Sequence, residues 1–202
     1  MRVPILAAVV AATAALLLGT GATSAAAAPG SDTTSVSAAS AGQPFADQAA
    51  KAHLTKAQTT SLQAKVDRYM KRTGGKQVAL NEIDLGGDAT LLVALPGEKH
   101  PRDFASGDSS RAAFDPCLQG QVHSGWFCAY SREGFNGDAL RWYECGRRAM
   151  PWGDWGSWIN DQTPGTRAIF FGADGAAYDA TPAPYSSNGR YYWTPVWSIK
   201  NC

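Results

Sequence analysis

The four cysteines carry the chemistry that is easiest to predict from this sequence. Cys117, Cys128, Cys145 and Cys202 all lie in the second half of the chain. No Cys-x-x-Cys pair occurs and the three histidines are scattered, so neither a zinc site nor a thiol redox centre has its usual spacing. An even number of cysteines in an exported chain indicates two disulfides. Three pairings are open, and we favour Cys117–Cys128 with Cys145–Cys202.

Catalytic motifs give no support to an enzyme. The sequence contains no Gly-x-Ser-x-Gly, no His-Glu-x-x-His and no phosphate-binding loop. His123 has no evident nucleophile as a partner. We therefore expect a non-catalytic protein without a cofactor. Paired carboxylates from distant positions stay open, because the fold decides whether they meet.

Charge and the N-terminal residues restrict the partners and the compartment. The formal net charge is +1. The sequence has no stripe of basic residues, so it gives no indication of a nucleic-acid partner. Arg2, an uncharged apolar run over 5–18 and small residues up to Ala28 are typical of a secretory signal peptide spanning 1–28. We expect an extracellular monomer that has no membrane contact after cleavage.

The mature chain divides by composition. Residues 29–53 are poor in large apolar side chains and are predicted to be a disordered linker. Residues 54–97 are predicted to form a helix over 54–74, with a Thr55–Gln58 capping box, and then a hairpin of strands 77–85 and 90–95. This small unit either packs on the rest of the protein or is loosely ordered. Residues 98–115 are polar and predict a second linker.

Residues 116–202 predict a small all-β domain. They hold all seven Trp and all four Cys but only one Lys. Short aromatic runs between Gly, Asn and Asp are typical of a sandwich or barrel. Asn188-Gly189 is a turn signal inside a long loop that begins near Pro182. Candidate strands are 126–131, 139–144, 158–160, 166–172 and 193–200.

Two segments of this domain resemble a known family. Tyr130 to Gly137 has the aromatic-x-x-x-x-Phe-x-Gly pattern of a βγ-crystallin-type Greek-key hairpin, where Gly137 allows the strand to fold back. The run Trp158-Ile-Asn-Asp-Gln-Thr163 is similar to the strand that follows in the actinobacterial secreted peptidase-inhibitor family, which includes the Streptomyces metalloproteinase inhibitor. The resemblance implies a disulfide-stapled, βγ-crystallin-like Greek-key sandwich over 116–202.

The resemblance also implies a function and raises the question of a metal. A family inhibitor presents a stiff loop to an extracellular peptidase, and our candidate is the loop 146–152 with Arg147, Arg148, Ala149 and Met150, next to Cys145. An ordinary connection between strands is the alternative for this loop. Many βγ-crystallin domains bind calcium, but Pro164 and Gly165 occupy the hydroxyl positions of that motif, so we expect no metal.

A binding module is the rival function. Trp152, Trp155 and Trp158 recur at three-residue steps with glycines between them. An exposed row of rings could bind a polysaccharide or a cell wall, whereas core packing is the more ordinary role of tryptophan. Inhibition assays and polysaccharide pull-downs separate the two functions.

Overall fold

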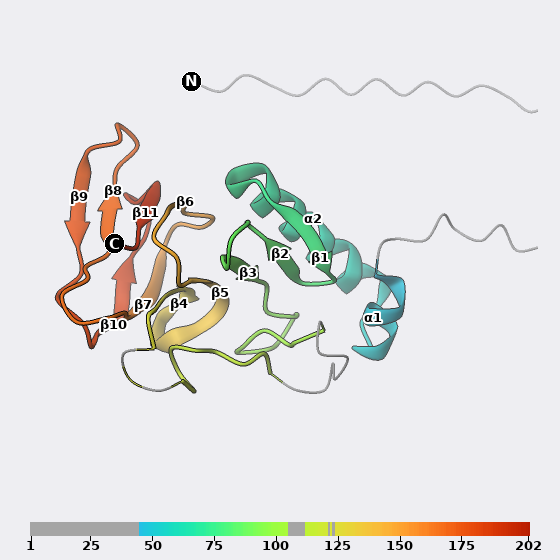
Figure 1. Ribbon diagram of the computed structural model, residues 1–202. Helices are drawn as coiled ribbons and strands as arrows, with labels where there is room; N and C mark the ends of the chain where they lie inside the picture. Colours follow the sequence, from blue (N-terminus) through green and yellow to red (C-terminus); the bar gives the residue numbers. More distant parts are fainter. Residues whose placement is uncertain (1–44, 105–111, 121, 123) are drawn as a thin grey trace, which may run out of the picture. The chain divides into compact units, whose positions relative to one another are not determined.

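Two antiparallel sheets contain most of the regular secondary structure of the described residues (Figure 1). The computed structural model describes residues 45–104, 112–120, 122 and 124–202. The predicted signal peptide, 1–28, and most of the predicted linker 29–53 lie outside these residues. The seven-stranded sheet has the order β1-β2-β3-β5-β4-β7-β10 and the four-stranded sheet has the order β6-β11-β8-β9. The elements are α1 (Ala46–Lys51), α2 (Lys56–Thr73), β1 (Lys76–Ala79), β2 (Glu82–Asp84), β3 (Thr90–Leu92), β4 (Trp126–Arg132), η1 (Glu133–Phe135), β5 (Asn136–Trp142), β6 (Arg147–Ala149), β7 (Trp155–Asp161), β8 (Ile169–Phe171), β9 (Ala177–Ala180), β10 (Ser186–Tyr192) and β11 (Ser198–Lys200).

Helix α2 begins and ends as the sequence predicts. The side chain of Thr55 accepts a hydrogen bond from the Gln58 amide at 3.2 Å, and the Gln58 side chain accepts one from the Thr55 amide at 2.9 Å. Gly74 follows the helix with φ 74°, a conformation that favours glycine. The buried stripe of α2 is Leu62, Val66 and Tyr69. The helix therefore contributes one apolar face to the core.

The residues after α2 form three strands instead of the predicted two. The run predicted as one strand over 77–85 is split into β1 and β2, and β3 follows the Gly86–Asp88 turn. The split occurs at Asn81, whose buried side-chain amide donates to the carbonyls of Val93 and Arg102 at 2.9 and 3.0 Å. β3 also pairs with β5, with Leu91 opposite Leu140. The segment 54–97 is thus part of the main sheet, and the loosely ordered alternative is wrong.

Both predicted linkers contain ordered, packed residues. The described end of 29–53 includes α1, in which Ala49 is buried, and the Gln48 side chain accepts from the Leu80 amide at 2.6 Å. In 98–115, Arg102 pairs with Ala112, and Phe104 is buried. Small alanines and a single phenylalanine are enough for packing here, because the neighbouring sheet already supplies the apolar surface. The amino-acid composition of these two segments did not predict that they pack on the sheet.

Strands β4 to β11 show the same connectivity twice. In β4–β7 the first, second and fourth strands lie in the seven-stranded sheet, whereas β6 lies in the other sheet. In β8–β11 the first, second and fourth strands lie in the four-stranded sheet, whereas β10 lies in the other sheet. The third strand of each run thus lies in the sheet that contains the other three strands of the other run. This exchange is compatible with the double Greek key expected for residues 116–202.

Two buried asparagines join the halves of this exchange. The Asn160 side-chain amide at the end of β7 donates to Thr166 O, Thr181 Oγ1 and Pro182 O at 3.0–3.1 Å. Asn201, after β11, accepts from the Gly146 amide at 2.9 Å and donates to the Glu144 carbonyl at 3.2 Å. Asn160, at the end of the β4–β7 run, thus holds the segment that follows β9. Asn201, at the end of the β8–β11 run, holds the segment that follows β5. Buried backbone groups that would otherwise lack partners are satisfied in this way.

Candidate functional site

The segment predicted as an inhibitory loop, 146–152, contains an edge strand of the four-stranded sheet, followed by a buried methionine. Residues Arg147–Ala149 are β6 and pair with Ser198–Lys200 of β11. Met150 is 1% exposed, and its amide donates to Trp197 O at 2.8 Å. A buried methionine cannot anchor a peptidase, so this prediction is corrected. The physical reason is that the apolar Met150 stabilises the protein more by burial than it could when exposed.

The two arginines of β6 are held on the protein. The Arg147 guanidinium lies 3.8 Å from the centre of the Phe171 ring, and its Nε donates to Ser198 Oγ at 2.8 Å. Arg148 donates to the Gly86 carbonyl at 3.0 Å. Both side chains therefore connect strands and turns. Arg147 is exposed, as the sequence predicts, although it lies against Phe171, whereas Arg148 is half-buried.

The disulfide pairing favoured from the sequence is confirmed. Cys117 pairs with Cys128, 11 residues away, with a Cα–Cα distance of 6.3 Å. Cys145 pairs with Cys202, 57 residues away, with a Cα–Cα distance of 5.4 Å. In the chain-entropy description, loops of these lengths correspond to about 3 and about 4 kcal/mol of stabilisation. The second bridge connects the end of β5 to the end of β11.

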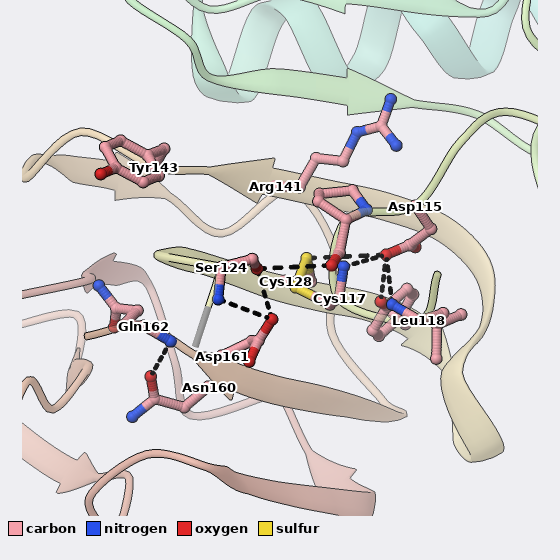
Figure 2. The surroundings of a disulfide bond; sticks show 12 residues. Asp115, Cys117, Leu118, Ser124, Cys128, Arg141, Tyr143, Asn160, Asp161 and Gln162 are labelled. Atoms are coloured by element: carbon pink, nitrogen blue, oxygen red, sulfur yellow. Dashed lines mark hydrogen bonds between the residues drawn. A yellow bond between two sulfur atoms is a disulfide. The ribbon is translucent and has the colours of Figure 1, made fainter. Parts of the chain in front are cut away.

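The shorter disulfide supports an exposed turn, residues 114–120, that we name the braced turn (Figure 2). Its brace is the buried carboxylate of Asp115. Asp115 Oδ1 accepts from the amides of Cys117 and Leu118 at 2.9 and 3.2 Å, and from the Tyr130 hydroxyl at 3.0 Å. Arg141 also donates to the carbonyl of Phe114. The turn is thus tied to β4 by the disulfide and Tyr130, and to β5 by Arg141.

Large apolar side chains project from this stiff segment. Phe114 is 59% exposed and Leu118 is 42% exposed, and Val122 just beyond the turn is 63% exposed. Large exposed apolar side chains on a rigid segment are typical anchors for a binding partner. The braced turn contains no lysine or arginine. Its chemistry therefore suits an apolar pocket better than an acidic one.

The charges beneath the braced turn are strongly affected by burial. Burial, followed by the adjacent Asp115 carboxylate, raises the pKa of the Tyr130 hydroxyl well above its usual range. Burial lowers the pKa of the Arg141 guanidinium, and nearby Asp115 opposes that effect. A cavity of about 70 Å³ adjoins these groups, which is far below the size of a typical ligand pocket. The cluster therefore acts as a support for the turn.

Two buried tyrosines predict a loss of stability at alkaline pH. Burial and the neighbouring Asp138 carboxylate raise the pKa of Tyr69, as burial and Asp115 do for Tyr130. Because each folded-state pKa lies above the unfolded value of about 10, this contribution is fully present below about pH 10 and is lost as the pH rises further. We expect the free energy of unfolding to fall by about 1.4 kcal/mol per pH unit for each tyrosine.

Urea denaturation between pH 8 and pH 11 measures this slope. In the double variant Tyr69→Phe, Tyr130→Phe these hydroxyls cannot ionise, so its free energy of unfolding should fall by about 2 kcal/mol less than that of wild type between pH 10 and pH 11. Equal slopes in the two proteins would contradict the assignment.

The side chains that could bind a metal among these residues are engaged in other bonds. Asp115, Cys117 and Cys128 bring their ligand atoms within 4.8 Å of one another. The two sulfurs are joined in a disulfide, however, and offer no thiolate to a metal. At the position of the calcium motif, the Asn160 amide nitrogen is engaged by three oxygens, and Asp161 accepts from the Ser124 amide at 3.3 Å and from its hydroxyl. These side chains connect loops.

The tryptophans of the predicted row have three different environments. Trp158 is buried, Trp152 is half-buried and Trp155 is exposed. Trp155 lies against Tyr192, with ring centres 5.0 Å apart, and the Arg190 guanidinium lies 4.0 Å from the centre of the Trp155 ring. They do not form one flat platform. Core packing is therefore confirmed for Trp158, and the half-buried Trp152 also packs against the core cluster.

Comparison of the chain with profiles of protein families, with characterised proteins and with solved structures finds no match. Within the described ranges, no helix has the length and apolar character needed to cross a membrane. The functional argument therefore depends on the residues themselves.

Sequence reasoning missed Asp115, Phe114 and Leu118 as site residues. Residues 98–115 were assigned to a linker, which separated Asp115 from the cysteine that it supports. A local signal was present: aspartate two residues before Cys117 can accept from the following amides, as it does in the structure. The exposure of Phe114 and Leu118 had no such signal, because it depends on tertiary packing.

Proposed function

We propose that this protein is a secreted, non-catalytic inhibitor of extracellular peptidases and that it presents the braced turn to them. The observation that carries the proposal is the combination of exposed Leu118 with a backbone held by the adjacent disulfide and by Asp115. The turn is held by the Cys117–Cys128 disulfide and by three hydrogen bonds to one buried carboxylate oxygen of Asp115. A segment ordered before binding loses little conformational entropy when it enters a peptidase cleft.

The side chains of the braced turn suggest the class of target. Phe114 and Leu118 are exposed, and basic residues are absent from the turn. Peptidases with an apolar specificity pocket, including zinc metallopeptidases, fit these side chains, whereas peptidases that select lysine or arginine do not. The arginines of β6 offer no substitute, because they pack on Phe171 and Gly86.

The fold and the disulfides support the same proposal. The exchange of β6 and β10 is compatible with the Greek-key architecture of the inhibitor family that the sequence resembles. Two disulfides suit an oxidising, extracellular compartment. The folded core also makes cleavage of the inhibitor itself slow, because proteolysis requires local opening of the chain.

The test is an inhibition assay with Leu118→Asp. We expect the wild-type chain to inhibit a thermolysin-like metallopeptidase at near-stoichiometric amounts and to leave a trypsin-like peptidase unaffected. Replacing the apolar anchor by a charge should weaken inhibition by at least about 30-fold, the effect of losing about 2 kcal/mol at a binding hot spot.

Val78→Asp is the matched control, because Val78 on β1 is similarly exposed but lies outside the turn. It should inhibit like wild type. Equal inhibition by the Leu118→Asp variant would remove the braced turn from the proposal. Failure of the wild-type chain against apolar-selective peptidases at large molar excess would remove the inhibitor function.

A further inference from the structure

A groove lies where the end of α2 meets the segments 150–153 and 194–197. Its volume is about 310 Å³, within the range of small-ligand sites. Arg72, Trp152 and Trp197 supply its large side chains, and none of its lining residues is acidic. The groove therefore combines aromatic walls with a positive charge.

The walls of the groove are fixed by backbone contacts. The Met150 amide donates to Trp197 O at 2.8 Å, and the Asp154 amide donates to Thr194 Oγ1 at 2.9 Å. Trp152 packs edge-on against Tyr69 of α2, with ring centres 5.9 Å apart. Such a site needs little rearrangement to receive a ligand.

Arg72 is positioned and yet has free donors. Its Nε donates to Met150 O at 3.1 Å, and its guanidinium lies 4.0 Å from the centre of the Trp197 ring. Its terminal N–H groups donate to no other residue in the described part of the chain. Trp197 remains 48% exposed beneath the guanidinium. An ordered planar fork with unused donors is suited to a carboxylate, which it can bind through two parallel hydrogen bonds.

We propose that this groove binds a carboxylate-bearing sugar unit of an acidic polysaccharide. The carboxylate would pair with the terminal nitrogens of Arg72. The C–H face of the sugar ring would pack on the part of the Trp197 indole that the guanidinium leaves exposed, and on Trp152, because aromatic rings attract polarised C–H groups. The positive groove without acidic lining residues favours an acidic sugar over a neutral one. The site is independent of the braced turn.

The second exposed aromatic stack has the same residue types but different electrostatics. Arg190 lies on Trp155, but its Nε is paired with Glu133 Oε1 at 3.0 Å. This ion pair neutralises the guanidinium and occupies one of its donors. Trp155 is therefore a matched control for an exposed tryptophan under an arginine whose charge is countered by a neighbouring carboxylate.

The experiment titrates the intact, oxidised chain with tetragalacturonate and with its methyl ester, using calorimetry and tryptophan fluorescence. We expect the acid to bind at least about 10-fold more tightly than the ester, because esterification removes the charge and one pairing oxygen. Arg72→Gln and Trp197→Ala should each weaken binding of the acid at least about 10-fold. Trp155→Ala should bind like wild type.

Several results would overturn the proposal. These are no binding of the acid by wild type, equal binding of acid and ester, or equal loss in the Trp155→Ala and Trp197→Ala variants. Near-UV circular dichroism identifies a variant that has lost its fold. If Arg72→Gln unfolds, the proposal is tested by the binding of the acid to the Trp197→Ala variant and by the ratio of the acid and ester affinities of wild type. Leu118→Asp should bind the acid normally, so a failure of this site is distinguishable from a failure of the inhibitor function.

Discussion

Residues 116–202 produced without the preceding segment are expected not to reach the native fold. Strand β5 would lose its partner β3, including the Leu91–Leu140 pair. Apolar residues before position 116, such as Val66 and Ile83, share one buried cluster with Trp142 and Met150. Removing them would expose a large part of that cluster to water. The loss is comparable to the total stability of a small protein, about 5–15 kcal/mol.

Thermal and denaturant unfolding of the two fragments, 45–202 and 116–202, tests this expectation. The longer fragment should unfold in one cooperative transition, whereas the shorter one should show no sigmoidal transition and should bind a hydrophobic dye. A cooperative transition in 116–202 at a similar temperature would show that α2 and β1–β3 are an accessory. In that case processing upstream of Phe114 would leave the fold that carries the braced turn intact, whereas removal of Asp115 would take away its brace.

Asp138→Ala is expected to cost about 3–5 kcal/mol of folding stability. Asp138 is fully buried on β5, and its carboxylate pairs with the Lys65 ammonium at 2.7 Å. It also accepts from the Tyr69 hydroxyl at 2.6 Å and from the Ala94 amide at 2.9 Å. One side chain thus joins the helix, the segment after β3 and β5. The alanine variant leaves a buried hydroxyl and a buried amide without a partner, and such groups are costly.

Urea denaturation of Asp138→Ala against Asp67→Ala measures this effect. Asp67 is an exposed carboxylate on α2 that accepts, within the described residues, only from the Gln63 side chain. Its replacement should change the unfolding free energy by less than about 0.5 kcal/mol. A similarly small change for Asp138→Ala would mean that the helix is held by apolar contacts alone. In that case the effects of Lys65→Met and Tyr69→Phe on the free energy of unfolding would simply add in the double variant.

The parts of the fold that depend on nearby residues could be predicted from the sequence. Thr55, Gln58 and Gly74 set the two ends of α2 because capping involves residues three or four positions apart. The fold-back of β4 into β5 followed from Gly137, which has φ 86°, and from Tyr130, whose ring meets Phe135 at 5.9 Å.

The parts that depend on distant residues could not be predicted. Asn188-Gly189 reads as a turn, yet both residues lie in β10, because β7 offers an edge with which that segment pairs. The segment 146–152 reads as a loop, yet β11 pairs with it from about fifty residues away. Local turn propensity is small compared with the free energy of completing a sheet. The groove at Arg72 was equally hidden, since its walls come from three separate segments.

The same physical limit applies to the braced turn. Its cysteine and its aspartate are visible in the sequence, but the partner hydroxyl of Tyr130 is fifteen positions further on. Polar side chains at that separation meet only when strand register places them together. The exposure of Leu118 is likewise a result of what the rest of the chain leaves uncovered.

The exchange of β6 and β10 gives the protein a tolerance to cutting. A peptidase that severed the chain between β7 and β8 would produce two fragments, yet β10 would still lie beside β7 and β6 beside β11. The Cys145–Cys202 disulfide spans that cut and would keep the fragments in one covalent molecule. A clipped copy could therefore stay assembled, with the braced turn untouched, in a medium full of the enzymes that it is proposed to block.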